Sequence, residues 1–410
     1  MRLTFRSLSE EAPDAAWREV FNVGWPGWRE WFLARGGNDK PRLEAAHKAL
    51  RRHMPEIESL WERLVTTAVA DADAARFLSF WSPPRYLVNC SQAVLVDDDG
   101  PLLIRNYDLD PRLSESTLLK SAWRRRQVVG MVEGMAGLAD GMNDGGLAAS
   151  LTFGGRTVTG PGFGIPWIMR YLLELCSDVA EAVDALRLLP CHMSYNVSVI
   201  DRQGNWATVF LAPDRPAIVT KHHFATNHQL GVEWPGHGRI TGTLERERHL
   251  RALLERRDLS AATLAANFGT APLFSAGYAR GFGTVYTAAY RPARGEVTLS
   301  WQGGAPQCWR LDDFRDRQML VAYSAHGSAL VAPGEASARA SSSRAHSDLV
   351  ADGDALAFGA PSPALELSDP TTTARHRLAA FRQRNHQQAA QEWVNLNQVF
   401  PGHDDRGDAA

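Results

Sequence analysis

Apolar residues recur at helical spacing over the first 80 residues of the chain. The stretch EEAPDAAWREVFNVGWPGWREWFLARGG carries apolar and aromatic side chains every three or four positions, and the next stretch places Leu43, Ala46 and Leu50 on one face. SPP at residues 82–84 then interrupts the pattern. We therefore expect residues 1 to about 80 to be helical throughout.

Patterns typical of strands begin at Tyr86. YLVNCSQAVLV and PLLIRNYDL flank the acidic turn DDDG, and YNVSVIDRQGNWATVFLAP and GTVYTAAYRPARGEVTLSWQGG are typical of further hairpins. Helical patterns lie between them in IPWIMRYLLELC, SDVAEAVDALRLLP and GTLERERHLRALLERRD. Because strands and helices do not alternate one by one, the order favours an α+β fold with antiparallel sheets covered by helices.

The composition changes after residue 330. Residues 331–373 are rich in Ala, Ser, Gly and Pro and cannot bury enough apolar surface to fold, which predicts a flexible linker. Residues 374–410 return to a helical pattern and end in a polar tail. The chain thus divides into a helical segment (1–89), a β-rich domain (90–330), a linker and a last helix with its tail.

The overall composition is that of a soluble globular protein: 44% of the 410 residues are hydrophobic, 22% are charged, and the net charge is −2. This balance gives no basic surface for nucleic acid or for an anionic membrane. We expect neither a secretory signal nor a membrane span, because the chain has no apolar run of about 18 residues.

Four cysteines lie far apart in the chain and form no CxxC pair: Cys90, Cys176, Cys191 and Cys308. A chain of this length does not need disulfides to stabilise its core, so we expect reduced thiols and a cytoplasmic protein. The histidines between residues 222 and 237 lack the regular spacing of zinc ligands, so we predict no metal site there.

Cys90 stands near the start of the first hairpin. If residues 98–100 form a three-residue loop, Cys90 lies directly opposite Asp108, with Cβ atoms about 5 Å apart. Strict alternation then places Arg105 on the other face, unless a bulge turns it round. The pairing predicts a thiol and a carboxylate in one site.

A lone cysteine is more often a small buried hydrophobe than a nucleophile. Around Cys90, however, the residues Asn89, Ser91 and Gln92 are polar, and the opposite strand changes from PLLI to RNYD at the same level. Burying such a cluster without a function is costly. The pattern therefore favours a functional thiol.

CSQAVLVDDDGPLLIRNYD resembles the N-terminal hairpin of linear-amide hydrolases of the N-terminal-nucleophile (Ntn) class. These include the choloylglycine hydrolases and, closer in layout, the autoproteolytic proteins similar to acyl-CoA:6-aminopenicillanate acyltransferase, peptidase family C45. The resemblance continues through GMNDGGLAASLTFGG, GFGIPWIMRYLLELC, YNVSVIDRQGNW and ATNHQ, over residues 83–305. It implies a four-layer αββα sandwich, with residues 1–89 as a helical pro-segment (the α subunit after cleavage) and residues 90–330 as the catalytic domain (the β subunit).

The resemblance also implies roles for individual residues. Cleavage of the Asn89–Cys90 bond makes Cys90 the nucleophile, and its freed α-amine, with an ordinary pKa of about 8, serves as the base. Asp108 orients the ammonium or thiol, and Arg105 lowers the pKa of the thiol. Asn227, in ATNHQ, contributes its amide to the oxyanion hole.

Further positions match the family less directly. Arg246 is a candidate for an arginine near the site, and Tyr107 and Asn143 for pocket residues. Thr152 stands where bile-salt hydrolases usually carry an asparagine, which leaves the second oxyanion donor to a backbone N–H and does not support bile-salt specificity. Asn89 replaces the usual glycine, so either thiol attack on its carbonyl or cyclisation of its side chain leads to cleavage.

The implied activity is acyl transfer at a linear amide or thioester through a Cys90 acyl-enzyme, resolved by water or an amine. The expected partners are a small-molecule amide or acyl donor, with acyl-CoA compatible as a substrate and no resident cofactor or metal. The two fragments are expected to stay associated non-covalently. The alternative is an unprocessed, non-catalytic protein of the same fold that acts as a binding or scaffold module.

Overall fold

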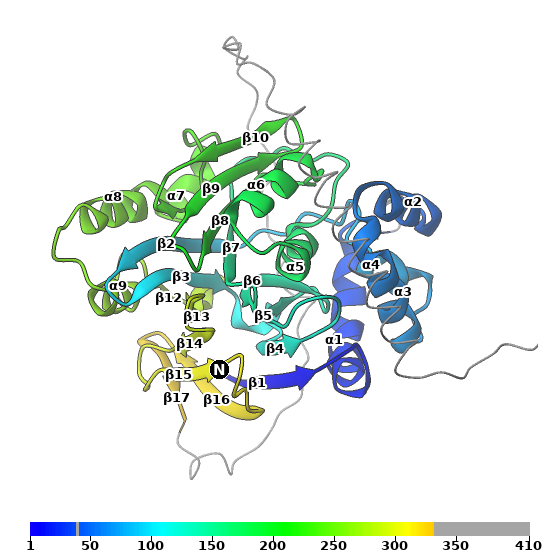
Figure 1. Ribbon diagram of the computed structural model, residues 1–410, viewed down its shortest axis with the longest axis horizontal. Helices are drawn as coiled ribbons and strands as arrows, with labels where there is room; N and C mark the ends of the chain where they lie inside the picture. The colour runs from blue at the N-terminus through cyan, green and yellow to red at the C-terminus, as the bar shows by residue number, and fades with distance from the viewer. Residues whose placement is uncertain (38–40, 332–410) are drawn as a thin grey trace, which may run out of the picture. The chain divides into compact units, whose positions relative to one another are not determined.

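Two β-sheets face each other and carry helices on their outer faces in the computed structural model, which describes residues 1–37 and 41–331 (Figure 1). β2 and β3 of the smaller sheet pack against β7 and β8 of the larger one. The expected α+β class and the four-layer αββα arrangement are thus confirmed. The predicted linker (331–373), apart from its first residue, and the predicted last helix and tail (374–410) lie outside the described residues.

The larger sheet is antiparallel except where β1 and β4 run parallel. Its strands are, in spatial order, β10 (Arg215–Thr220), β9 (Trp206–Ala212), β8 (Tyr195–Asp201), β7 (Leu147–Phe153), β6 (Gly137–Asn143), β5 (Val128–Glu133), β4 (Thr117–Ser121), β1 (Arg2–Glu10), β16 (Arg317–Ser324) and β17 (Gly327–Leu330). The smaller sheet contains β11 (Phe224–Ala225), β2 (Asn89–Asp97), β3 (Gly100–Leu109), β13 (Phe282–Arg291), β14 (Glu296–Ser300) and β15 (Gln307–Arg310), with β12 (Ala276–Gly277) paired to β13.

Two pairs of helices form the outer layers. α5 (Ile165–Leu175) and α6 (Val179–Leu188) cover the larger sheet, and α8 (Thr243–Leu254) and α9 (Ala261–Phe268) cover the smaller one. A short helix, α7 (Pro235–Ile240), precedes α8. Within residues 1–37 and 41–331, 3₁₀ turns lie at Pro55–Ile57, Pro111–Leu113 and Tyr278–Arg280.

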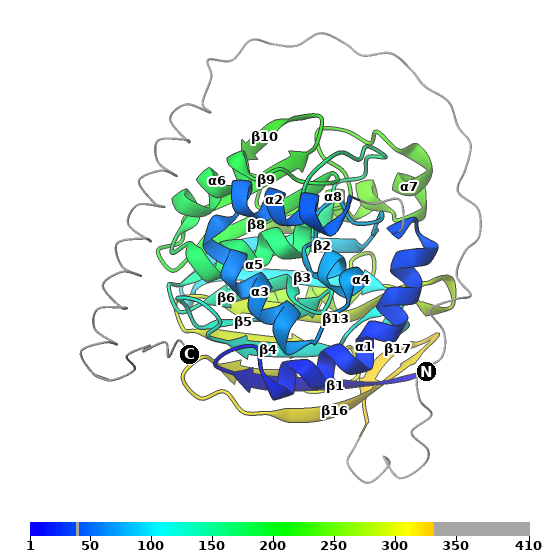
Figure 2. The same cartoon turned by 90° about the vertical axis from the view of Figure 1, so that its right-hand side faces the viewer.

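The remaining helices lie along one side of the sandwich, on the right of Figure 1 and towards the viewer in Figure 2. They are α1 (Ala15–Ala34), α2 (Leu43–His53), α3 (Glu58–Thr67) and α4 (Ala72–Leu78). The indole of Trp17 on α1 donates to the carbonyl of Met135 at 2.9 Å, which joins this group to the turn between β5 and β6. None of the helices in the two described ranges is both long and apolar enough to cross a bilayer.

The first ten residues are not helical, and the sequence prediction is wrong there. They form β1, an internal strand of the larger sheet between β4 and β16. Alternate residues such as Phe5 and Ser7 are buried, and the ring of Phe5 packs against Trp301 at 4.9 Å between centroids. Part of the segment 1–89 is therefore built into the core of the domain that follows it.

Alternation along the β2–β3 hairpin decides which layer each side chain meets. The amide of Gln92 faces the larger sheet, where it donates to Ser198 at 2.9 Å and accepts from Ser150 at 2.7 Å. The neighbouring residues Ala93 and Ile104 point the other way, into the apolar core under α8 and α9. Each strand of this hairpin thus has one face between the sheets and one face under the helices.

Candidate active site

The hairpin pairs Cys90 with Tyr107, and not with Asp108 as the sequence predicted. Asp108 pairs with Asn89 instead. The difference arises at the turn, where Gly100, at φ 95°, already pairs with Asp97, so the loop is one residue shorter than expected.

This one-residue difference in register exchanges the two faces of the strand. Arg105 now shares the face of Cys90, between the sheets, and no bulge in the hairpin is needed. Asp108 lies on the opposite face, under the helices, together with Asn89. The thiol of Cys90 and the carboxyl of Asp108 therefore occupy adjacent positions of the ladder but lie on opposite faces of the sheet.

Arg105 links the thiol to a buried carboxylate. Its Nη2 donates to Cys90 Sγ at 2.7 Å, and its Nη1 donates to Asp140 Oδ2 at 2.8 Å. All three residues have no exposed surface. Tyr286 donates to the same carboxylate at 2.8 Å, and Tyr290 donates to its second oxygen. The result is a row of thiol, guanidinium and carboxylate that runs from the smaller sheet to the larger one.

Burial dominates the electrostatics of this row. It raises the pKa of the Cys90 thiol to about 11, although Arg105 opposes the shift. Burial also raises the pKa of Asp140, again against Arg105. Burial disfavours the charged form of Arg105 too, but the charges of Cys90 and Asp140 outweigh it and the pKa of Arg105 is raised. In the uncleaved chain the thiol is therefore protonated at neutral pH.

Two further side chains hold the peptide groups of Cys90. Its N–H donates to Asn227 Oδ1 at 3.2 Å, and its carbonyl accepts from Arg246 Nη1 at 2.5 Å. Arg246 Nη2 also donates to Asn227 Oδ1 at 2.7 Å. Arg246 comes from α8 and Asn227 from the segment after β11, so the structure brings both sequence candidates to Cys90.

The bond before Cys90 is held by the same amide. Asn227 Nδ2 donates to the carbonyl of Val88 at 3.3 Å and to that of Phe153 at 3.2 Å. Within the described part of the chain, the side-chain oxygen of Asn89 is buried and has no hydrogen-bond partner. The peptide bond expected to be cut thus lies between two anchored carbonyl groups, those of Val88 and Cys90.

Asp108 is a buried carboxyl on which the charges of Arg246 and Arg105 both act. Thr284 Oγ1 donates to it at 2.7 Å. Burial raises the pKa of Asp108 to about 6, while Arg246, Thr284 and Arg105 act in the opposite direction. This carboxyl can therefore exchange a proton near neutral pH.

The other sequence candidates have different surroundings. Tyr107 donates to Glu133, and its ring lies 4.8 Å from the guanidinium of Arg105. Thr152 donates to the carbonyl of Thr226 at 2.9 Å and so supports the segment that carries Asn227.

Asn143 ties the larger sheet to a helix. Its amide donates to the carbonyls of Leu173 and Cys176, both at 2.8 Å, which joins the end of β6 to the end of α5. Asn143 therefore supports the packing of α5 on the larger sheet, and neither of these contacts reaches Cys90.

An apolar pocket adjoins the site and was missed by the sequence analysis, because its walls come from distant parts of the chain. Tyr86 forms part of its wall, and the Tyr86 hydroxyl lies 3.0 Å from that of Tyr107, the cross-strand neighbour of Cys90. Its lining comprises Trp28, Trp31, Phe77, Phe80, Pro83, Pro84 and Tyr86 from the segment 1–89, and Glu133, Gly134, Gly164, Ile165, Pro166, His192, Met193 and Tyr195 from the β-rich domain.

Asp140 was also missed, although the sequence carries a signal for it. It is an isolated acid in the otherwise apolar strand GLADGM, and burying an acid there requires a cation. The four histidines considered for a metal make separate contacts: His222 stacks on Phe224 and His237 on Trp234, the ring of His223 lies tilted against Trp206, and His228 pairs with Glu247.

Comparison with known proteins confirms the resemblance. Residues 95–306, about half of the chain, match the sequence model of the acyl-coenzyme A:6-aminopenicillanic acid acyl-transferase family. The match begins after Cys90 and includes Arg105, Asp108, Asn227 and Arg246. No curated protein matches the chain.

Several solved structures are similar to this chain at low sequence identity. A mutant conjugated bile acid hydrolase from Clostridium perfringens is 12% identical, with a TM-score of 0.37, and the match covers 56% of this chain and 96% of that one. Penicillin V acylase from Agrobacterium tumefaciens is 14% identical, with a TM-score of 0.34 and coverage of 52% and 82%. A Caenorhabditis elegans ortholog of N-acylethanolamine-hydrolyzing acid amidase is 18% identical, with a TM-score of 0.36 and coverage of 50% and 93%.

The raised pKa of Asp108 predicts a specific pH dependence of stability. The folded protein keeps this proton up to a pH of about 6, whereas the unfolded chain loses it near about 4. Stability from Asp108 is therefore present below about pH 4 and is lost as the pH rises through about 6, by about 3 kcal/mol in all. Urea unfolding measures this difference between two proteins, Cys90→Ala and the double variant Cys90→Ala with Asp108→Asn. Both lack the Cys90 thiol to prevent the expected cleavage. A difference between the two that does not change with pH contradicts this account.

Proposed function

Because the chain belongs to the acyl-coenzyme A:6-aminopenicillanic acid acyl-transferase family, and so to enzymes of the amide-hydrolase and acyltransferase kind, we propose that Cys90 is its nucleophile after self-cleavage of the Asn89–Cys90 bond. The observation that carries the proposal is the environment of Cys90. Its thiol, its N–H and its carbonyl are each bound by a buried side chain, and these come from three separate elements: Arg105, Asn227 and Arg246.

Self-cleavage begins from the uncleaved chain. The Cys90 sulfur attacks the carbonyl carbon of Asn89, the C–N bond breaks as the C–S bond forms, and the thiol proton ends on the departing amine. Water then hydrolyses the thioester, which leaves a carboxylate on Asn89 and a free thiol and ammonium group on Cys90. Asp108, with its pKa of about 6, lies on the other face of the strand from the thiol and is suited to exchange a proton with the departing amine.

The second route starts from Asn89 itself. Its side-chain nitrogen attacks its own backbone carbonyl and releases Cys90, leaving a succinimide on the smaller fragment. The unpartnered side-chain oxygen of Asn89 is compatible with either route. Both routes give the same larger fragment, so the proposed nucleophile does not depend on which one operates.

In the cleaved enzyme the α-amine of Cys90, with an ordinary pKa of about 8, takes the thiol proton as the sulfur attacks a substrate carbonyl. Arg105 stabilises the thiolate and is itself neutralised by Asp140. When the carbonyl of Val88 moves away after cleavage, the amide of Asn227 becomes available to the oxygen of the tetrahedral intermediate. Water or an amine then attacks the thioester and releases the acyl group.

The apolar pocket beside the site supports a substrate with an apolar acyl chain. Its aromatic walls offer contact area for an aliphatic or aromatic group, and its wall residue Tyr86 contacts Tyr107, the cross-strand neighbour of Cys90. Because half of the wall comes from residues 1–89, this segment has to remain bound after cleavage. β1, as an internal strand of the larger sheet, provides the attachment.

Self-cleavage is the first test. We expect purified protein to separate on a denaturing gel into fragments of about 10 and 35 kDa, in proportion to the lengths of the two parts of the 45.2-kDa chain. If the thiol attacks, Cys90→Ala should remain one band; if Asn89 cyclises, Cys90→Ala should still be cut. Cys191→Ala, which removes another buried thiol, should be cleaved like wild type. The two wild-type fragments should co-elute in gel filtration under native conditions, because β1 is an internal strand.

The result that contradicts the proposal is a wild-type chain that stays full length and does not react with an acylating reagent at Cys90. That result favours the alternative, an unprocessed scaffold protein of the same fold.

The pocket predicts that the length of the acyl chain affects the KM of the substrate. Trp31→Ala removes a wall of the pocket and should raise KM about tenfold for a substrate with a long apolar acyl chain, without changing KM for an acetyl substrate. Trp25→Ala, on the same helix but outside the pocket, is the matched control. Steady-state kinetics with a series of acyl anilides measures the effect. Equal changes in the two variants, or equal changes for the two substrates, would exclude this pocket as the acyl site.

A further inference from the structure

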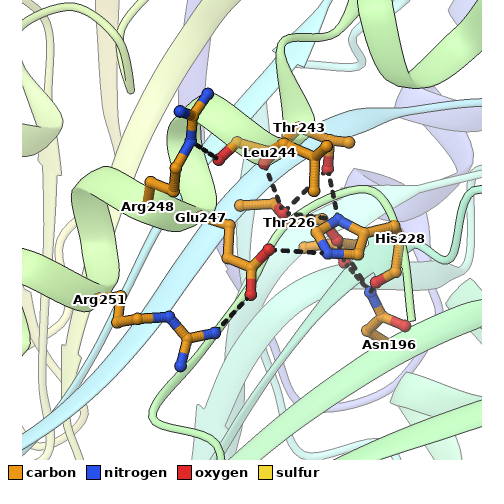
Figure 3. Close-up of polar contacts among 9 residues, drawn as sticks. Asn196, Thr226, His228, Thr243, Leu244, Glu247, Arg248 and Arg251 are labelled. Carbon is orange, nitrogen blue, oxygen red and sulfur yellow. Dashed lines mark hydrogen bonds and ion pairs between the residues drawn. The ribbon is translucent and has the colours of Figure 1, made fainter. Parts of the chain in front are cut away.

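The two residues that hold the peptide groups of Cys90 are each followed in the chain by a titratable residue. His228 follows Asn227, and Glu247 follows Arg246. His228 Nε2 lies 3.0 Å from Glu247 Oε2, as Figure 3 shows. The segment after β11 is therefore tied to α8 twice: at Cys90 by Asn227 and Arg246, and farther out by His228 and Glu247.

Two threonines complete the outer tie. The hydroxyl of Thr243, the first residue of α8, lies 2.9 Å from His228 Nδ1 and 2.9 Å from the Thr226 hydroxyl (Figure 3). The hydroxyl of Thr226 donates to the carbonyl of Thr243 at 3.1 Å. Asn196, from β8, donates to the carbonyls of Thr226 and His228 at 2.8 and 2.9 Å. The segment carrying Asn227 is thus fixed on both sides of that residue.

His228 has a polar partner at each of its two ring nitrogens, Glu247 at Nε2 and Thr243 at Nδ1. Burial lowers the pKa of His228, and Arg246 adds to the effect, while Glu247 opposes it. A ring with a hydrogen on Nε2 donates to Glu247. The Thr243 hydroxyl, which donates its single hydrogen to the Thr226 hydroxyl, lies against Nδ1 on the other side of the ring. Arg251 donates to the second oxygen of Glu247 at 2.7 Å, so the carboxylate is also satisfied.

We propose that Thr226, His228, Thr243 and Glu247 form a clamp that sets the position of Asn227 relative to Arg246, and thereby the geometry of acyl transfer at Cys90. The inference rests on the proposed function. None of the four side chains touches the reacting atoms in the contacts described. They are positioning residues that act through Asn227 and Arg246.

The most conservative disruption of the clamp is Thr243→Val. Valine has nearly the shape of threonine but removes the hydroxyl that contacts His228 Nδ1 and the Thr226 hydroxyl, and it keeps the backbone carbonyl to which Thr226 donates. Thr243→Ser restores the hydroxyl. Thr117→Val is the matched control, because Thr117 is equally buried and donates to a backbone carbonyl at 2.9 Å, but lies on β4.

In the clamp account, Thr243→Val lowers both the rate of self-cleavage and kcat about tenfold and leaves KM unchanged. Thr243→Ser returns both rates to within about twofold of wild type, and Thr117→Val leaves them at the wild-type value. Amide hydrogen exchange, measured on the same proteins, should increase over residues 224–229 and in the first turn of α8 in Thr243→Val alone.

Three results overturn the clamp. They are unchanged exchange in Thr243→Val, increased exchange with unchanged kcat, and an equal loss of activity in Thr117→Val. A wild-type protein with no self-cleavage and no acyl transfer refutes the proposed function instead. In that case hydrogen exchange alone decides whether the clamp joins the two segments.

Discussion

A guanidinium without access to solvent must be neutralised by groups inside the protein, and Arg105 is such a group. Its two partners lie on different sheets, Cys90 on β2 and Asp140 on β6. The thiol is therefore set against the larger sheet through one buried cation. Because removing Asp140 would leave that cation uncompensated, the spacing of the two sheets and the position of the sulfur depend on the same interaction.

The same site combines a firmly held cysteine with a peptide bond that is reactive in our proposal. Burial keeps the Cys90 thiol protonated, and Asn227 and Arg246 hold the peptide groups on either side of its α-carbon. In our proposal cleavage changes this balance: an ammonium group forms on Cys90, and the amide of Asn227 gives up its contact with Val88. The groups that hold the intact chain thus become, in our proposal, the groups that bind the substrate.

Local patterns in the sequence were enough to locate the first hairpin, the helices α5, α6 and α8, and Cys90 among its polar neighbours. Arg105 and Asn227 entered as site candidates through the family resemblance. The partners of these residues depended on contacts that local patterns do not contain. The register moved by one residue because Gly100 takes part in the ladder, and this alone decides whether Arg105 or Asp108 shares the face of Cys90. The first strand was taken for a helix because its partners lie elsewhere in the chain, β16 more than 300 residues away.

The central claim is that the mature enzyme begins with its own nucleophile, and N-terminal sequencing of the larger fragment tests it most directly. The account predicts Cys-Ser-Gln-Ala as the first residues, with the cysteine as a free thiol, because cleavage falls between Asn89 and Cys90. A larger fragment that begins at any other residue would contradict it, because the thiol would then have no α-amine of its own to serve as base.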